Sequence, residues 1–162
     1  MAVQLVPPSP TVRFRQHHGA REGADRVSAY GRHDDEWDVL VAAGKQFLRE
    51  RALMERDTSY TEMSVTLARR TGYRAFDFSE QAERAAMGYL LGRIVQETYP
   101  VVGAMLSALV IYLDANHAGP GFYQLAQDMG LLQKGASKQA REAFWIQQVR
   151  GTFEHVRAGG RL

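Results

Sequence analysis

Residues 59–100 read SYTEMSVTLARRTGYRAFDFSEQAERAAMGYLLGRIVQETYP, and this stretch contains the signals of two successive helices. Ser59 and Glu62 have the spacing of a capping box, in which the serine oxygen accepts a backbone N–H and the glutamate reaches back to the cap. Apolar residues at helical spacing then continue as far as Gly72, and glycine commonly follows a helix end. The pattern predicts a short helix that begins after Ser59 and ends at Gly72.

A second, longer helix is predicted over about 80–98. Ser79 is a suitable N-cap residue, and Pro100 is expected to end the helix because proline lacks a backbone N–H. The turn between the two helices spans 71–78, and its aromatic residues are expected to pack underneath: Tyr73, Phe76 and Phe78.

The longest apolar stretch of the chain follows this pair of helices. Residues 104–113 read AMLSALVIYL, which predicts a buried strand, although periodicity alone does not distinguish it from a buried helix. Residues 114–121 read DANHAGPG and predict the tip of a hairpin, with Phe122 and Tyr123 on the returning side. Two helices, a strand and a Gly-rich turn in this order are compatible with a winged-helix-like centre over 59–122.

Amphipathic helices are predicted on both sides of this centre. One is capped by Asp34 and runs to about residue 55, with an apolar stripe that comprises Trp37, Leu40, Val41, Gly44, Phe47 and Leu48. After a short helix over 124–129, Ser137 can cap a last helix whose shared face comprises Phe144, Trp145, Gln148, Val149, Phe153 and Val156. The sequence therefore predicts an α+β fold, mainly α, with a winged-helix-like centre and flanking amphipathic helices. Whether these helices dock within the chain or on a second copy stays open.

Composition is typical of a soluble protein with a single core. The chain has 162 residues, of which 45% are hydrophobic and 23% charged, and it contains no cysteine. We expect one helical domain over 33–162, preceded by a flexible basic arm over 1–32 that contains prolines, glycines and arginines. Without cysteine no disulfide is available, and no secretory signal or membrane-spanning run is visible. We therefore expect a cytoplasmic protein without a membrane partner.

Basic charge is concentrated at the two ends of the chain. The formal net charge is +3 over residues 1–32, −5 over 33–129 and +4 over 130–162. Such ends suit a polyanion because Lys and Arg neutralise phosphates and release counterions. A solvated surface is the simpler explanation.

Five short segments carry a resemblance to a known family. They are Tyr60-Thr61-Glu62-Met63, Leu67-Ala68, Arg84-Ala85-Ala86-Met87-Gly88, residues 105–111 and Gly119-Pro120-Gly121-Phe122. With these segments, residues 60–122 resemble the winged-helix DNA-binding domain of O6-alkylguanine-DNA alkyltransferases and alkyltransferase-like proteins. The resemblance implies that Tyr60 contacts and helps rotate a phosphodiester. It also implies that Arg84 enters the base stack, although Arg84 lies one residue further from its glycine than in the family.

The resemblance fails at the family's reactive centre. Its Pro-Cys-His-Arg motif, or the form with Trp for Cys, should fall near Leu106-Ser107-Ala108-Leu109 and is absent. Alkyl transfer needs a thiolate nucleophile, which this chain lacks. The expected function is therefore DNA binding without enzymatic activity and without a cofactor.

A DNA-binding face can be assigned on the second helix of the pair. Gln81 and Arg84 occupy one side of this helix, with Arg93 further along, where they could meet base edges in a groove. Phosphate contacts are expected from three arginines that precede the helix: Arg69, Arg70 and Arg74. The acidic side chains of Glu80 and Glu83 in the same first turn oppose this assignment, and a solvated face is the alternative.

Two other functions stay open. The amphipathic helices could serve a helical interaction or assembly subunit, either a homo-oligomer or part of a larger bacterial or phage complex. A metal-dependent nuclease would use converging carboxylates, and the candidates are Glu62, Asp77, Glu97 and Asp114, with Glu97 and Asp114 the first to test. Their spacing matches no metal motif, so no metal site is predicted. Ser107 is interpreted as a core serine because no base is placed beside it.

Overall fold

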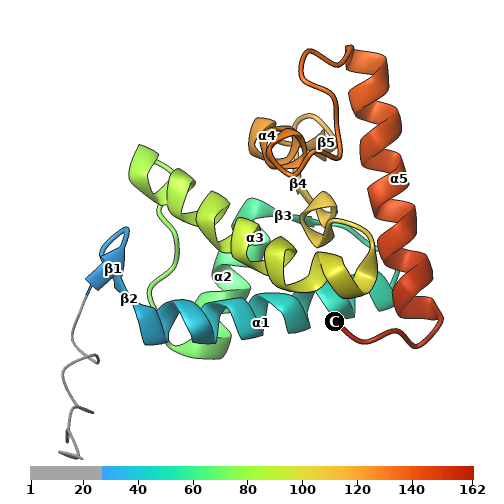
Figure 1. Ribbon diagram of the computed structural model, residues 1–162. Coiled ribbons are helices and arrows are strands. Elements are labelled where there is room, and N and C mark those ends of the chain that lie inside the picture. The colour runs from blue at the N-terminus through green and yellow to red at the C-terminus, as the bar shows by residue number, and fades with distance from the viewer. Residues whose placement is uncertain (1–26) are drawn as a thin grey trace, which may run out of the picture.

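The computed structural model describes residues 27–162, which form a mainly helical α+β fold (Figure 1). The helices are α1 (Asp34–Leu53), α2 (Tyr60–Thr71), α3 (Gln81–Val102), the 3₁₀ helix η1 (Leu106–Leu109), α4 (Pro120–Asp128) and α5 (Lys138–Arg157). The strands are β1 (Val27–Ala29), β2 (Arg32–His33), β3 (Thr58–Ser59), β4 (Val110–Tyr112) and β5 (His117–Ala118). Figure 1 shows α3 lying across α1, with α5 along one side of the molecule.

A small three-stranded sheet lies at the centre of the chain, in the order β3-β4-β5. β3 pairs with β4 in parallel, with Thr58 opposite Val110, and β4 pairs with β5 as an antiparallel hairpin, with Ile111 opposite Ala118. The sheet therefore joins the start of α2 to the hairpin that follows η1.

The apolar stripe of α1 is buried as predicted. Its six residues and Ala52 are the buried residues of the helix, and they pack on α2, α3 and α5. α1 packs tightly against α3 at Gly44, because a Cβ atom there would lie 2.6 Å from Cδ1 of Ile94. Glycine at this position lets the two helix backbones come together.

The predicted cap of α2 is confirmed in part. Ser59 Oγ accepts the backbone N–H of Glu62 at 3.0 Å, and Gly72 ends the helix in the left-handed conformation with φ of 76°. The Glu62 side chain does not reach back to the N-cap backbone. It accepts the Thr58 hydroxyl at 2.7 Å and a guanidinium N–H of Arg51 at 3.3 Å, which ties α2 to α1.

The predicted ends of α3 were wrong. Glu80, not Ser79, occupies the N-cap position, because Ser79 donates its hydroxyl to Asp77 within the preceding turn. The helix continues past Pro100 to Val102 and ends at Gly103, which has φ of 70°. Pro100 is exposed in the last turn, so the carbonyl group that loses its helical partner can face solvent.

Only residues 110–112 of the predicted strand over 104–113 form a strand, which is β4. Residues 106–109 form η1, a compact turn that buries all four side chains, and a fully buried segment gives no alternation to read. The hairpin returns through β5, so the prediction that Phe122 and Tyr123 form its returning side was wrong. Both lie in α4, which begins four residues before the predicted start because Pro120 occupies its first turn.

The last helix docks within the chain. Ser137 caps α5 as predicted, with its Oγ accepting the Ala140 N–H at 3.1 Å. Trp145 donates from Nε1 to the backbone oxygen of Ala108, and Gln148 accepts the backbone N–H of Met105. These two bonds attach α5 to the segment around η1.

The N-terminal boundary of the folded region lies earlier than predicted. Strands β1 and β2 form an antiparallel hairpin, and Arg32, which the prediction assigned to the arm, is completely buried. Residues 1–26 of the predicted arm lie outside the described residues. Within residues 27–162, no helix has the length and apolarity needed to cross a bilayer.

Candidate functional site

A small pocket lies between α3, η1, β4 and α4, and we call it the α3 pocket. Its volume is about 180 Å³. Its lining comprises Tyr60, Arg84, Gly88, Leu91, Gly92, Ser107, Tyr112, Gly121, Phe122 and Leu125. Two of these, Tyr60 and Arg84, belong to the predicted DNA-binding face.

Two tyrosine rings form one wall of the α3 pocket. The ring centroids of Tyr60 and Tyr112 lie 4.9 Å apart at an interplanar angle of 36°. Gly119 makes room for both, because a Cβ atom there would lie 2.6 Å from the Tyr112 ring and 3.0 Å from the Tyr60 hydroxyl oxygen. Burial raises the pKa of Tyr60 to about 12, so its hydroxyl stays a neutral hydrogen-bonding group at physiological pH.

A bare strip of α3 forms another wall. Arg84, Gly88 and Gly92 recur every four residues and therefore lie on one side of the helix. Among residues 27–162, and apart from the neighbouring backbone of α3 itself, no heavy atom lies within 4 Å of the positions that Cβ atoms of the two glycines would take. Arg84 Nη1 donates to the backbone oxygens of Phe78 at 2.6 Å and Ser79 at 3.2 Å, which holds the guanidinium against the first turn of α3.

Ser107 also lines this pocket, and its hydroxyl is buried. The residue is 3% exposed, and among the residues that the structure describes its Oγ has no hydrogen-bond partner. A buried hydroxyl without a partner destabilises the fold by about 1–3 kcal/mol. A ligand atom or a bound water in the α3 pocket would satisfy it.

The other predicted DNA contacts do not gather around this pocket. Arg70 forms a paired hydrogen bond with Glu50 of α1, and this contact lowers the pKa of Glu50. Arg93 pairs with Asp38 of α1 at 2.9 Å, which raises the pKa of Arg93. Two further predicted contacts, Arg69 and Gln81, are exposed on α2 and α3 and lie outside the pocket lining.

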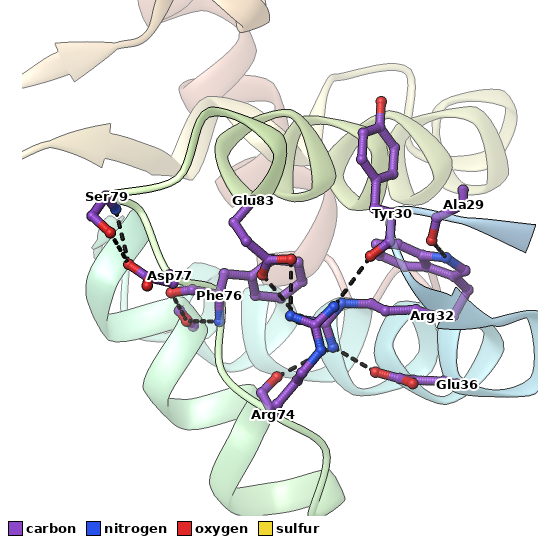
Figure 2. Close-up of polar contacts among 11 residues, drawn as sticks. Ala29, Tyr30, Arg32, Glu36, Arg74, Phe76, Asp77, Ser79 and Glu83 are labelled. Carbon is purple, nitrogen blue, oxygen red and sulfur yellow. Dashed lines mark hydrogen bonds and ion pairs between the residues drawn. The ribbon is translucent and has the colours of Figure 1, made fainter. Parts of the chain in front are cut away.

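Arg74 belongs to a separate cluster around the buried Arg32 (Figure 2). Arg32 donates to Glu36 at 2.5 Å, to Glu83 at 3.4 Å and to the backbone oxygen of Arg74 at 3.2 Å. Arg74 itself pairs with Glu83 at 2.9 Å and donates to the backbone oxygen of Tyr30. The cluster therefore joins the β1–β2 hairpin to α1 and α3. The charge of Arg74 is paired with Glu83 in this cluster and contributes to the fold.

No family model, curated protein or solved structure matches this chain.

The carboxylates considered for a nuclease site do not converge. Glu62 bonds Thr58, and Glu97 pairs with Lys45 at 3.2 Å. Within the described range 27–162, no three His, Asp or Glu side chains lie close enough together to hold a metal ion.

Sequence reasoning missed several residues of the α3 pocket. Tyr112 was treated as part of a buried strand and Ser107 as a core serine, whereas both line the pocket. The signal that could have identified the site is the pair Gly88 and Gly92. Two glycines one turn apart are costly inside a helix and mark a face that something approaches closely.

Proposed function

We propose that the protein binds DNA without catalysing a reaction on it, and that the α3 pocket receives one unstacked base. The proposal includes a winged-helix-like arrangement of α2, α3 and the β4–β5 hairpin. The observation that carries it is the meeting of Tyr60 and Arg84 at one pocket beside a strip of α3 that lacks side chains. The pocket combines an aromatic wall, a cation and a flat surface, which suits a planar heteroaromatic ring.

The size of the pocket supports a single ring. Its volume of about 180 Å³ is below the roughly 300–1,000 Å³ of sites for drug-sized ligands. A base lying on Gly88 and Gly92 would meet the Tyr112 ring, and stacking on an aromatic side chain contributes about 1–3 kcal/mol per base. The Ser107 hydroxyl could then bond a ring nitrogen or carbonyl oxygen.

The resemblance to the alkyltransferase-like family supports the same site. The family's reactive motif corresponds to 106–109, and this segment forms η1, with Ser107 on the pocket wall. Tyr60 and Arg84, the residues to which the resemblance gives roles on DNA, line the same pocket. In this comparison Ser107 stands where the family has its reactive cysteine. Because a serine hydroxyl does not replace the thiolate that alkyl transfer needs, the proposed activity is binding alone.

The ion pairs of the predicted phosphate contacts set the expected salt dependence. On the predicted DNA-binding face, Arg70, Arg74 and Arg93 are paired with carboxylates, which leaves Arg69 and Arg84 of that face without a carboxylate partner among residues 27–162. Each neutralised phosphate steepens the plot of log affinity against log salt by about 0.9. We expect a slope shallower than about −3, with single strands preferred over duplexes because their bases are already unstacked.

The test is fluorescence anisotropy with labelled single-stranded and duplex oligonucleotides at two salt concentrations. Gly88→Leu places a side chain in the pocket from an exposed helix position where a Cβ atom has room, and it should weaken single-strand binding by at least about tenfold. Ala85→Leu, on the same helix outside the lining, is the matched control and should bind as the wild type does. Absence of oligonucleotide binding at low salt would remove the proposal.

An assembly subunit is the second candidate, and the same ion pairs favour it. With two predicted phosphate contacts, Arg70 and Arg74, and the predicted groove residue Arg93 paired with carboxylates, the chain could recognise protein surfaces. The hairpin exposes Tyr112 by 46% and Leu113 by 71%, next to the α3 pocket. Sedimentation that shows only monomers at micromolar concentration would count against a homo-oligomer.

A further inference from the structure

A second pocket lies on the other side of the β4–β5 hairpin, and we call it the α5 pocket. Its volume is about 450 Å³. Its residues come from α4, α5 and the segment around β5, and Figure 1 shows β5 and α4 beside the first half of α5. The lining comprises Ala115, Asn116, His117, Tyr123, Lys138, Arg141, Glu142 and Trp145.

Two cations from the first turns of α5 reach this pocket. Lys138 and Arg141 both line it, and within residues 27–162 neither forms an ion pair with a carboxylate. The Arg141 guanidinium lies over the Tyr123 ring, 5.4 Å from its centroid, which orients it. The first turn of α5 contains no acidic residue, so the positive end of the helix dipole adds to these charges.

Aromatic side chains form the other part of the lining, and their polar atoms hold them in place. Trp145 donates from Nε1 to the backbone oxygen of Ala108 at 2.9 Å, which fixes the indole. His117 Nδ1 lies 2.7 Å from the backbone oxygen of Ala118. A carbonyl oxygen only accepts, so Nδ1 donates this bond.

We propose that the α5 pocket binds a nucleotide unit, with its base against Trp145 and its phosphate between Lys138 and Arg141. The volume lies within the roughly 300–1,000 Å³ of small-molecule sites, and the lining offers a stacking surface and two cations together. Glu142 adds an acceptor for a ribose hydroxyl or an exocyclic amine. Inorganic phosphate alone or a nucleoside alone would use only half of these contacts.

This chemistry has two sources, a free mononucleotide and the phosphorylated end of a strand. The proposal does not rest on binding at the α3 pocket, because the two pockets share no lining residue. Gly88→Leu, which places a side chain in the α3 pocket, should therefore leave mononucleotide binding unchanged.

The experiment is isothermal titration calorimetry of the full chain with AMP, adenosine and inorganic phosphate. AMP should bind at least about tenfold more tightly than either fragment. Arg141→Gln should weaken AMP binding at least about tenfold, whereas Arg150→Gln, further along α5 and outside this pocket, should have no effect. Arg141 is exposed, so its variant should keep the wild-type melting curve, recorded by circular dichroism.

Competition separates the two sources. A 5′-phosphorylated oligonucleotide that displaces AMP, while its unphosphorylated form does not, assigns the site to a strand end. AMP that binds without being displaced assigns it to a free nucleotide, and both results support the site. No saturable AMP binding to the folded chain at millimolar concentration, or equal affinities of Arg141→Gln and the wild type, would overturn it.

Discussion

Replacing Glu83 with leucine tests the charge cluster that joins the N-terminal hairpin to α3. Arg32 is 0% exposed and depends on Glu83, Glu36 and one backbone oxygen for its hydrogen bonds. Removing one partner of a buried ion pair costs about 3–5 kcal/mol where it leaves the other charge unpaired; Arg32 keeps Glu36, so this range is the upper limit for Glu83→Leu. A protein of this size loses about 2–4 °C of melting temperature per kcal/mol, so Glu83→Leu should lower it by at most about 6–20 °C.

The assay is urea unfolding followed by tryptophan fluorescence. Trp37 is a local probe, because it packs 5.7 Å from the Arg32 guanidinium and donates to the backbone oxygen of Ala29 in the hairpin. Glu80→Leu, at an exposed position just before α3, is the control and should change stability by less than about 0.5 kcal/mol.

A second substitution distinguishes the buried charge from lost packing. Arg32→Met combined with Glu83→Leu removes both charges of the pair, and this double variant should be more stable than Glu83→Leu alone. The reasoning is refuted if Glu83→Leu unfolds within about 1 kcal/mol of the wild type. It is also refuted if the double variant is the less stable of the two.

Two further predictions concern the wall of the α3 pocket and the contact between α1 and α3. The pKa of Tyr60 is raised to about 12 in the folded chain, so the folded state holds its proton more tightly, and stability should fall as pH rises from 10 to 12, by up to about 1.4 kcal/mol per pH unit. Denaturant titrations should show a shallower fall for Tyr60→Phe, and equal falls would contradict the assignment. Gly44→Ala should destabilise by about 1–3 kcal/mol, although alanine favours helices, because its Cβ would meet Cδ1 of Ile94. Ile94→Val removes that atom and should recover part of the loss in the double variant; a Gly44→Ala protein as stable as the wild type would contradict the close helix contact.

Local rules predicted the helix interiors of this chain better than the helix ends, because the predicted caps at Asp34 and Ser79 were wrong: His33 and Glu80 occupy those positions. The stripe from Trp37 to Leu48 and the serine caps at Ser59 and Ser137 were correct, because each depends on residues within one or two turns. The prediction over 104–113 succeeded only in part. Its side chains are buried from several directions by α3 and α5, and such burial leaves no periodic pattern in the sequence.

The candidate site was less predictable because charge partners are distant in sequence. The sequence placed Arg32 in a predicted basic arm. Its partner Glu83 is distant in sequence, and only the fold brings the two side chains together. Arg70 and Arg93 read as free cations, whereas α1 supplies their carboxylates. Tyr60 and Arg84 were selected through the family resemblance, and the fold places both at one pocket.

The most direct test of base binding in the α3 pocket is a set of backbone amide NMR spectra recorded during titration with a short single-stranded oligonucleotide. The glycines of the lining, Gly88, Gly92 and Gly121, report on the pocket because amide resonances respond to a ligand bound against their own residues. We predict that these three resonances shift in a saturable way in the wild type. In Gly88→Leu, the resonances of Gly92 and Gly121 should not shift when the oligonucleotide is added. Saturable shifts confined to other parts of the molecule, or no shifts at all, would contradict the account.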